Sequence, residues 1–202
     1  MPALRAALSG PDADTTPALD ADTALTEALW RITGDAHEAV AVLDSVFRRA
    51  ARSPWSQWPL ARAAHAAELL GQAGQPLAPH LEASLADPRL APTAATALLS
   101  VAEPASLDRP ALAEAALAAA ETGTDPQGAC DALGLLSAAL TYDHLSLLAV
   151  LATGDARTVC SGIEDRVIDQ DETFRRRAQA LLATVRTSAR SFRDPGEEGP
   201  CL

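Results

Sequence analysis

The segment Ala-Leu-Trp-Arg-Ile-Thr-Gly-Asp, residues 28–35, is predicted to join the end of one helix to the start of the next. Gly34 can take the left-handed conformation that ends many helices. Asp35, directly after it, can accept hydrogen bonds from the free amides at the start of the following helix. The segment therefore predicts two helices joined by a tight turn. Asp108 and Asp125 are predicted to begin later helices in the same way as Asp35.

Variants of this segment recur along the chain, at residues 67–74, 97–101 and 149–155. Gly34 and Gly74 are forty positions apart, and Gly154 follows Gly34 by three times forty. A repeat of helix pairs with a period of about forty residues is typical of HEAT and armadillo arrays. The spacing predicts a stack of helix pairs.

Apolar residues recur every three or four positions in each predicted helix, which is typical of a helix with one face in a core. In the first helix, from Thr23 to Thr33, this stripe is Leu25, Ala28, Leu29 and Ile32. In a central helix it is Leu90, Ala94, Ala97, Leu98 and Val101. No window alternates with a period of two, so we expect an all-α fold of about ten or eleven helices.

The distribution of apolar and turn-forming residues divides the chain into three parts. Residues 1–22 are predicted to be a short N-terminal helix followed by a flexible loop rich in Pro, Asp and Thr. Residues 23–190 are predicted to be the repeat domain, which ends with one helix marked by Val159, Ile163 and Val167 and a last one from Asp171 to Arg186. Residues 191–202 have no apolar period and are predicted to be a disordered tail.

Two phrases, Leu29 to Asp35 and Asp87 to Val101, resemble the bacterial HEAT-repeat family, whose members include phycobilin lyase-type proteins. The resemblance covers roughly Thr23 to Ser188. It implies a short right-handed α-solenoid of antiparallel helix pairs, in which the second helix of each pair lines a concave groove. The chain departs from the pattern where one repeat is short, with 29 residues between Leu69 and Leu98.

Composition narrows the possible partners. The chain has 202 residues, of which 48% are hydrophobic and only 3% aromatic, so we expect one domain with an aliphatic core. The net charge is −11 and all sixteen basic residues are arginine. Such a charge repels phosphate backbones and anionic lipid, which argues against nucleic acid and membranes as partners.

Three cysteines, Cys130, Cys160 and Cys201, form no recognisable pair, as expected for idle thiols in a reducing compartment. The first ten residues lack the cationic and apolar regions of a signal peptide. No stretch of about twenty apolar residues could span a membrane. We therefore expect a cytoplasmic protein.

No pattern of catalytic or cofactor-binding residues stands out. HEAT-like deoxyhypusine hydroxylases bind di-iron through repeated His-Glu pairs, but this chain has only His37-Glu38, which favours a helix surface over a metal site. No serine or cysteine lies in a nucleophile motif. We expect no catalytic residue, no metal and no cofactor.

Candidate binding residues come from two features. Trp55 and Trp58 share a face if their turn is helical, and they either contact a partner or fill a gap between repeats. The resemblance implies that the second helices present a further set of side chains to the groove. This set is His37, Asp44, Arg48, His80, Glu114 and Asp143.

These observations leave rival functions open. The first is a non-catalytic scaffold that binds a protein or peptide in its groove. The second is an enzyme or enzyme accessory that holds a small ligand there, as the lyase relatives do. The third, a HEAT-like DNA glycosylase, needs a basic concave face, which the net charge of −11 opposes.

Overall fold

The computed structural model describes residues 3, 6–8, 14–52, 57–155 and 164–191, and in the last of these ranges it describes the side chains of residues 166–187. Every regular element in these residues is helical, so the all-α prediction is confirmed. The elements are α2 (Thr16–Thr33), α3 (Ala36–Ala50), α4 (Gln57–Leu70), the 3-10 helix η1 (Gly71–Leu77), α5 (Ala78–Ser84), α6 (Ala91–Val101), α7 (Arg109–Glu121), α8 (Pro126–Leu135), the 3-10 helix η2 (Ser137–Ala139), α9 (Tyr142–Thr153) and α10 (Glu164–Ser191).

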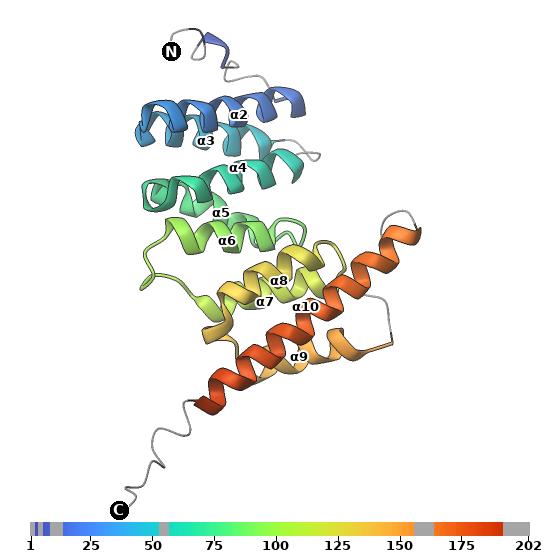
Figure 1. Cartoon of the computed structure of the whole chain (residues 1–202). Helices are drawn as coiled ribbons and strands as arrows, with labels where there is room; N and C mark the ends of the chain where they lie inside the picture. The colour runs from blue at the N-terminus through green and yellow to red at the C-terminus, as the bar shows by residue number, and fades with distance from the viewer. Residues whose placement is uncertain (1–2, 4–5, 9–13, 53–56, 156–163, 192–202) are drawn as a thin grey trace, which may run out of the picture.

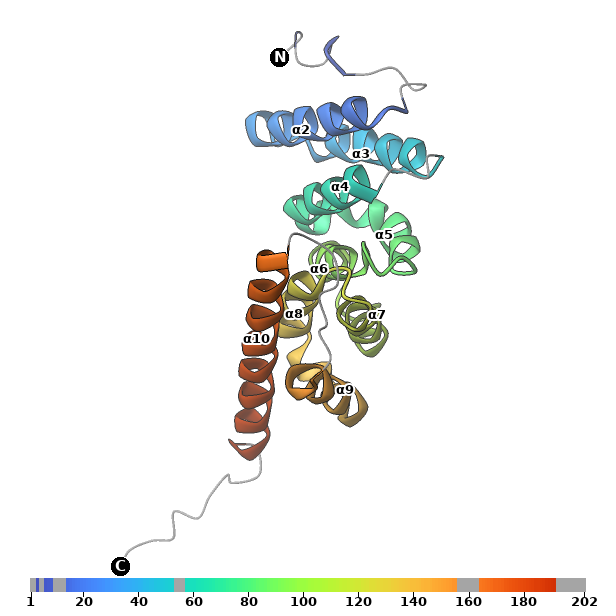
Figure 2. The same ribbon diagram turned by 90° about the vertical axis from the view of Figure 1, so that its right-hand side faces the viewer.

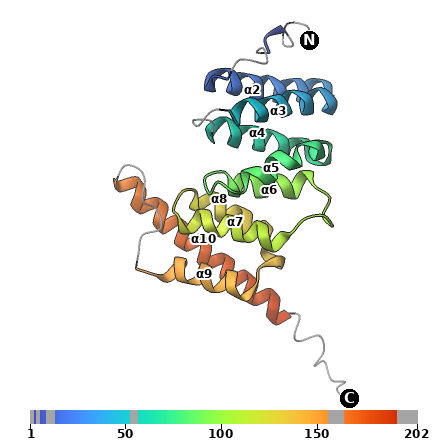
Figure 3. The same ribbon diagram turned by 180° about the vertical axis from the view of Figure 1, so that it is seen from behind.

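The helices stack in two layers along the molecule (Figures 1 and 3). One layer holds the even-numbered helices, and each contacts the next, from α2 through α4, α6 and α8 to α10. The other layer holds α3, η1 with α5, α7 and α9. Helix α6 lies near the middle and contacts α4, α5, α7 and α8, whereas α2 and α3 form one end of the stack.

Helix ends agree with the predicted turn chemistry. Gly34 is left-handed, with φ of 66°, and its N–H donates to the Trp30 carbonyl at 2.8 Å. The Asp35 carboxylate accepts the Glu38 N–H at 3.2 Å and begins α3. Asp108 and Asp125 cap α7 and α8 in the same way. The predicted ends and starts of helices are confirmed at these positions.

The core is aliphatic, and its central part follows the predicted stripe. The five stripe residues of α6 are all buried, with Leu98 only 1% exposed. Alanines are frequent on the buried faces of α4, α6 and α7, which lets neighbouring helices approach closely. The periodicity therefore predicted burial correctly in the middle of the array.

The first helix is longer than predicted. Residues 16–22, expected to lie in a flexible loop, form the first turns of α2. Pro17 is compatible with a first helical turn because its missing N–H would have no partner there. The Thr15 carbonyl accepts the Leu19 N–H at 3.0 Å, and the Leu19 side chain is fully buried. The Pro, Asp and Thr content that predicted a loop is here the start of a helix.

The predicted apolar stripe of α2 is wrong in its orientation. Ile32 is 59% exposed, and Leu25 and Ala28 are only half-buried. The buried side instead carries polar residues, because the Asp22 carboxylate pairs with the Arg49 guanidinium of α3 inside the interface. The buried residues of α2 are Leu19, Asp22, Thr23, Thr26 and Leu29.

Two hydroxyls complete this polar face of α2. The Thr23 and Thr26 hydroxyls donate back to the carbonyls of Leu19 and Asp22, at 2.9 and 2.7 Å. Each buried hydroxyl is thereby satisfied within its own helix, so burying it costs little. The side of α2 that is buried carries a charge pair and hydroxyls that are hydrogen-bonded within the helix. The pattern of apolar residues in the sequence could not have revealed the pair or these hydrogen bonds.

Helix boundaries differ from prediction at two further places. α4 ends at Leu70 rather than near Ala73, and the glycine-rich segment after it forms η1. α10 runs without a break from Glu164 and includes both Val167 and the predicted last helix, because no proline or glycine interrupts residues 164–191. The described residues therefore contain fewer than the ten or eleven helices expected. Val159, Ile163 and residues 192–202 lie outside the described part.

Helix α10 is held to the array by polar side chains as well as by its apolar face (Figure 2). Arg175 donates to the Gly154 carbonyl, and Gln179 donates to the Ala152 carbonyl at 3.2 Å. These carbonyls belong to the end of α9, where cations and donors are favoured. Arg177 pairs with Asp131 of α8. Arg175 and Arg177 thus tie α10 to α9 and α8.

Candidate functional site

The predicted groove residues lie on the layer made by α3, α5, α7 and α9. They form two separate clusters there. Asp44 and Arg48 of α3 meet His80 of α5, whereas Glu114 of α7 lies across a pocket from Asp143 of α9. We call this layer's outer side the odd-helix face.

The first cluster joins α3 to α5. The Asp44 carboxylate accepts a hydrogen bond from His80 Nε2 at 2.8 Å and pairs with Arg48 one turn along its own helix. The His80 ring stacks on Phe47, with ring centroids 5.1 Å apart and planes 6° from parallel. His80 is thereby held by a carboxylate at its edge and an aromatic ring at its face.

The charges in this cluster are balanced locally. Partial burial alone would raise the pKa of the Asp44 carboxyl, but the hydrogen bond from His80 and the charge of Arg48 outweigh it. The net result is a pKa below the ordinary value of 3.8. Because each charged group already has a partner, this cluster works as a clamp between two helices.

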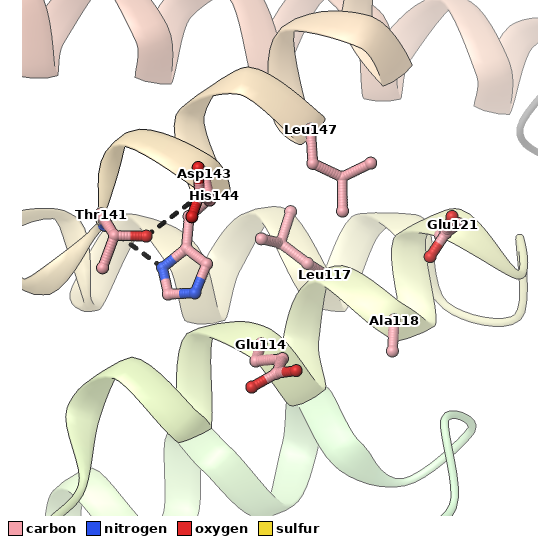
Figure 4. A pocket seen from close by; sticks show the side chains of 8 residues that line it. All are labelled: Glu114, Leu117, Ala118, Glu121, Thr141, Asp143, His144 and Leu147. Carbon is pink, nitrogen blue, oxygen red and sulfur yellow. Dashed lines mark hydrogen bonds between the residues drawn. The ribbon is translucent and has the colours of Figure 1, made fainter.

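The second cluster surrounds a pocket of about 430 Å³ between α7 and α9 (Figure 4). Its apolar lining comes from Leu117, Ala118 and Leu147. Carboxylates stand around this lining: Glu114 and Glu121 project from α7, two turns apart, and Asp143 projects from the first turn of α9. All three carboxylate residues are exposed.

A capping box fixes the His144 ring beside this pocket. The Thr141 hydroxyl accepts the His144 N–H at 3.3 Å, and His144 Nδ1 accepts the Thr141 N–H at 3.2 Å. Since Nδ1 accepts this bond, the neutral ring carries its proton on Nε2. Nε2 lies on the side of the ring that faces α7 and Glu114 in Figure 4. The pocket thus has a donor beside its acidic side chains.

The pocket carboxylates differ from Asp44 of the first cluster, which pairs with Arg48. Within the described part of the chain, none of Glu114, Glu121 and Asp143 forms an ion pair. Carboxylates pair with guanidinium and ammonium groups, and an apolar surface beside them suits the hydrocarbon stem of an arginine or lysine side chain. The arrangement can therefore bind a basic side chain.

The remaining predicted site residues lie elsewhere. His37 is exposed at the start of α3 and joins neither cluster. Trp58 is 67% exposed at the start of α4, so it does not fill a gap between repeats. Trp55 lies outside the described residues.

Sequence reasoning missed Glu121, Thr141, His144 and Leu147 of the pocket. Glu121 follows Glu114 by seven residues, which places both on one helix face and could have been noticed. Thr141 and His144 have the spacing of a capping box. The residue three positions after the cap is usually Glu or Gln in such a box, so the sequence did not indicate that a histidine would take this place.

The described residues give less support to metal binding, nucleophilic catalysis or insertion into a membrane. No group of three or more His, Cys, Asp or Glu residues suited to a metal occurs in the described residues. Burial raises the pKa of the Cys130 thiol to about 11, which makes it a poor nucleophile at neutral pH. None of the described helices is both long and apolar enough to cross a bilayer.

No model of a known protein family, no curated protein and no solved structure matches this chain. Its function is therefore inferred from the odd-helix face itself.

Proposed function

We propose that this protein is a non-catalytic interaction module that binds a basic segment of a protein or peptide partner on its odd-helix face. The observation that carries the proposal is the α7–α9 pocket. Three exposed carboxylates stand around an apolar surface there, and none has a cationic partner among the described residues.

The arrangement of the helices supports an array of the HEAT type, and we propose that the two layers form a short right-handed α-solenoid. Each helix contacts its neighbour in sequence or the next helix of its own layer. Such arrays gain stability by joining the apolar stripes of successive pairs, and they offer extended surfaces for partner chains. The cytoplasm is the compartment that we propose for it, because Cys130 is a buried free thiol.

A partner chain fits the site better than an enzymatic substrate. Binding pockets for small molecules are mostly enclosed and apolar, with a few polar groups that converge. Here the charged residues Glu114, Glu121 and Asp143 are exposed to solvent, and α3 and α5 belong to the same layer of helices. An extended basic segment could use the pocket for one side chain and the rest of the face for others.

The pocket volume supports a second candidate. A volume of about 430 Å³ lies within the range of roughly 300–1,000 Å³ that small-molecule pockets occupy. A small cationic ligand, such as a guanidinium or polyamine compound, would satisfy the same carboxylates. The alternative function is then that of a ligand-holding enzyme or enzyme accessory.

The test measures the fluorescence anisotropy of a labelled peptide of arginine and glycine at physiological salt. We expect Glu114→Gln combined with Asp143→Asn to weaken binding about tenfold or more, since each charge-assisted contact contributes about 1.5–3 kcal/mol. The matched control is Asp169→Asn with Glu172→Gln, which removes the same charge from exposed positions of α10.

The control pair should bind as the unmodified protein does. An equal loss in both double variants would mean that only the overall negative charge attracts the peptide. Binding of free arginine or spermidine as tight as that of the peptide would favour the small-ligand alternative. Duplex DNA should bind no more tightly than about 10⁻⁴ M at the same salt.

A further inference from the structure

Among the described residues that line the α7–α9 pocket, His144 is the only one that can become positively charged. Its ring is half-buried at the third position of α9. Nδ1 accepts the Thr141 N–H at 3.2 Å, and Nε2 lies on the side of the ring that faces α7 and Glu114 (Figure 4). One ring nitrogen thus completes the helix cap, while the other is turned towards the helix that carries the pocket glutamates.

A second proton can enter the ring only at Nδ1, because Nε2 already carries one in the neutral form. Nδ1 then becomes a donor and cannot accept the Thr141 N–H. The other bond of the capping box, from the His144 N–H to the Thr141 hydroxyl, does not involve the ring. Protonation therefore gives the ring a positive charge and removes the hydrogen bond that holds it in the cap.

Two sets of groups around the ring act on this charge in opposite senses. Glu114 and Glu121 of α7 and Asp143 of α9 line the same pocket, and their negative charges attract a cationic ring. The free amides at the start of α9 repel it, because the positive end of the helix dipole lies there. A charged ring therefore depends on the pocket carboxylates, and it loses their attraction when another cation takes them.

The cations of the helices that pack against α9 lie outside the pocket. Arg109 of α7 is five residues before Glu114, which places it about 140° around the helix. On α10, Arg175 donates to a carbonyl at the far end of α9, and Arg186 is exposed. None of these arginines lines the pocket, so any positive charge within the described lining comes from His144.

We propose that the proton on His144 regulates this pocket, an inference that rests on the proposed function. Neutral His144 leaves Glu114, Glu121 and Asp143 available to a basic segment, whereas protonated His144 pairs with them from within the pocket. Because the proton and the segment compete for the same carboxylates, each lowers the protein's affinity for the other.

The direction of the effect follows from the ordinary titration of these side chains. Histidine changes its charge between about pH 5 and 8, whereas aspartate and glutamate ordinarily keep theirs down to about pH 4–5. Over the range in which His144 can gain its proton, the carboxylates therefore stay charged. A fall in pH should release the basic segment.

The test follows the binding of an arginine–glycine peptide to the full chain by fluorescence anisotropy, from about pH 8 to about pH 5.5 at constant ionic strength. The peptide has blocked ends and a rhodamine label, so that nothing in it changes charge over this range. We expect the unmodified protein to bind at least about fivefold more weakly at the lower pH, the small end of the coupling between two sites.

The decisive variant is His144→Gln. Glutamine is one of the usual residues at this position of a capping box, and its side-chain oxygen can accept the Thr141 N–H without ever becoming charged. We expect this variant to bind the peptide as the unmodified protein does at the higher pH, and to keep that affinity at the lower pH. The matched control is His65→Gln on α4, in the other layer, which should keep the full pH dependence.

A calorimetric titration with the same peptide measures the second consequence of competition, which is the release of protons on binding. At a pH in the middle of the anisotropy profile, the unmodified protein should release a fraction of a proton, seen as a heat that depends on the ionisation enthalpy of the buffer. His144→Gln should release none at the same pH.

The outcomes separate this inference from the proposed function. A peptide that fails to bind even at the higher pH would overturn the proposed function and the regulation with it. Binding that weakens equally in the unmodified protein and in His144→Gln, or that does not weaken at all, would overturn the role of His144 alone. Loss of the pH dependence in His65→Gln would also overturn that role, because the overall charge of the protein would then be the cause.

Discussion

Helices α2 and α6 have similar apolar periodicity in the sequence, yet their apolar stripes are buried to different extents in the structure. In α6, all five residues of the predicted stripe are buried, because helices pack on several sides of it. In α2, Leu29 alone of the predicted stripe is buried, whereas Leu25 and Ala28 are half-buried and Ile32 is exposed. An apolar stripe marks a packing face, but whether the packing occurs within the chain depends on the helix's place in the array.

The two helices also differ in how they pack against their neighbours. α6 uses aliphatic side chains, whereas α2 uses the Asp22–Arg49 pair and threonines that are satisfied within the helix. A buried ion pair contributes less net stability than its short contact suggests, but removing one partner is costly. The comparison can therefore be tested at both helices by single substitutions.

The largest effect is expected at the buried pair. Asp22→Ala leaves Arg49 buried without the carboxylate that pairs with it, which should cost about 3–5 kcal/mol. Asp14→Ala removes the partner of Arg52 from an exposed pair and should cost less than about 1 kcal/mol. Urea unfolding of both variants measures the difference. Equal midpoints would show that the Asp22 pair does not hold α2 in place.

The next largest effect is expected in the centre of α6. Leu98→Ala removes a side chain that is 1% exposed, and its loss should cost about 2–5 kcal/mol. Leu135→Ala, on the surface of α8, provides the control and should cost no more than about 0.5 kcal/mol. The measurement is again the urea midpoint. An unchanged midpoint for Leu98→Ala would contradict the central packing.

A smaller effect is expected from pH at the α3–α5 clamp. The pKa of Asp44 is lower in the folded protein than its ordinary value of 3.8, so the folded state binds this proton more weakly than the unfolded chain does. The stabilisation is present above pH 3.8 and disappears as the pH falls through the folded-state pKa. Solvent screens part of it, because the side chain is 34% exposed.

Asp44→Asn should therefore unfold with a shallower dependence on pH than the unmodified protein between about pH 5 and 3. Urea melts at several pH values give the slope directly. Parallel slopes in the two proteins would mean that His80 and Arg48 do not stabilise the Asp44 carboxylate.

The smallest effect is expected on the outward side of α2. Ile32→Ala should change the unfolding free energy by no more than about 0.5 kcal/mol, since Ile32 is 59% exposed. The measurement is again the urea midpoint. A loss comparable to that of Leu98→Ala would show that Ile32 is packed within the single chain and that the contrast between α2 and α6 is wrong.

The sequence predicted the candidate site in part. Asp44, His80, Glu114 and Asp143 were predicted to lie on the second helices of their pairs, and in the structure they lie in one layer. It could not show that Asp44 accepts a hydrogen bond from His80, 36 residues later, while Glu114 has no such partner in the described residues. That difference depends on which helices meet, and local spacing does not contain it.

The sequence by itself determined the helical class, the helix ends at Gly34, Asp35, Asp108 and Asp125, and the buried stripe of α6. These features depend on short-range physics: backbone conformation, capping hydrogen bonds and the 3.6-residue period. Only the tertiary structure decided the start of α2, the side that α2 buries, the unbroken course of α10, and which carboxylates have no cationic partner among the described residues. Each of these depends on contacts between residues far apart in the chain, such as Asp22 with Arg49 and Arg177 with Asp131. Their energies exist only once the helices have packed.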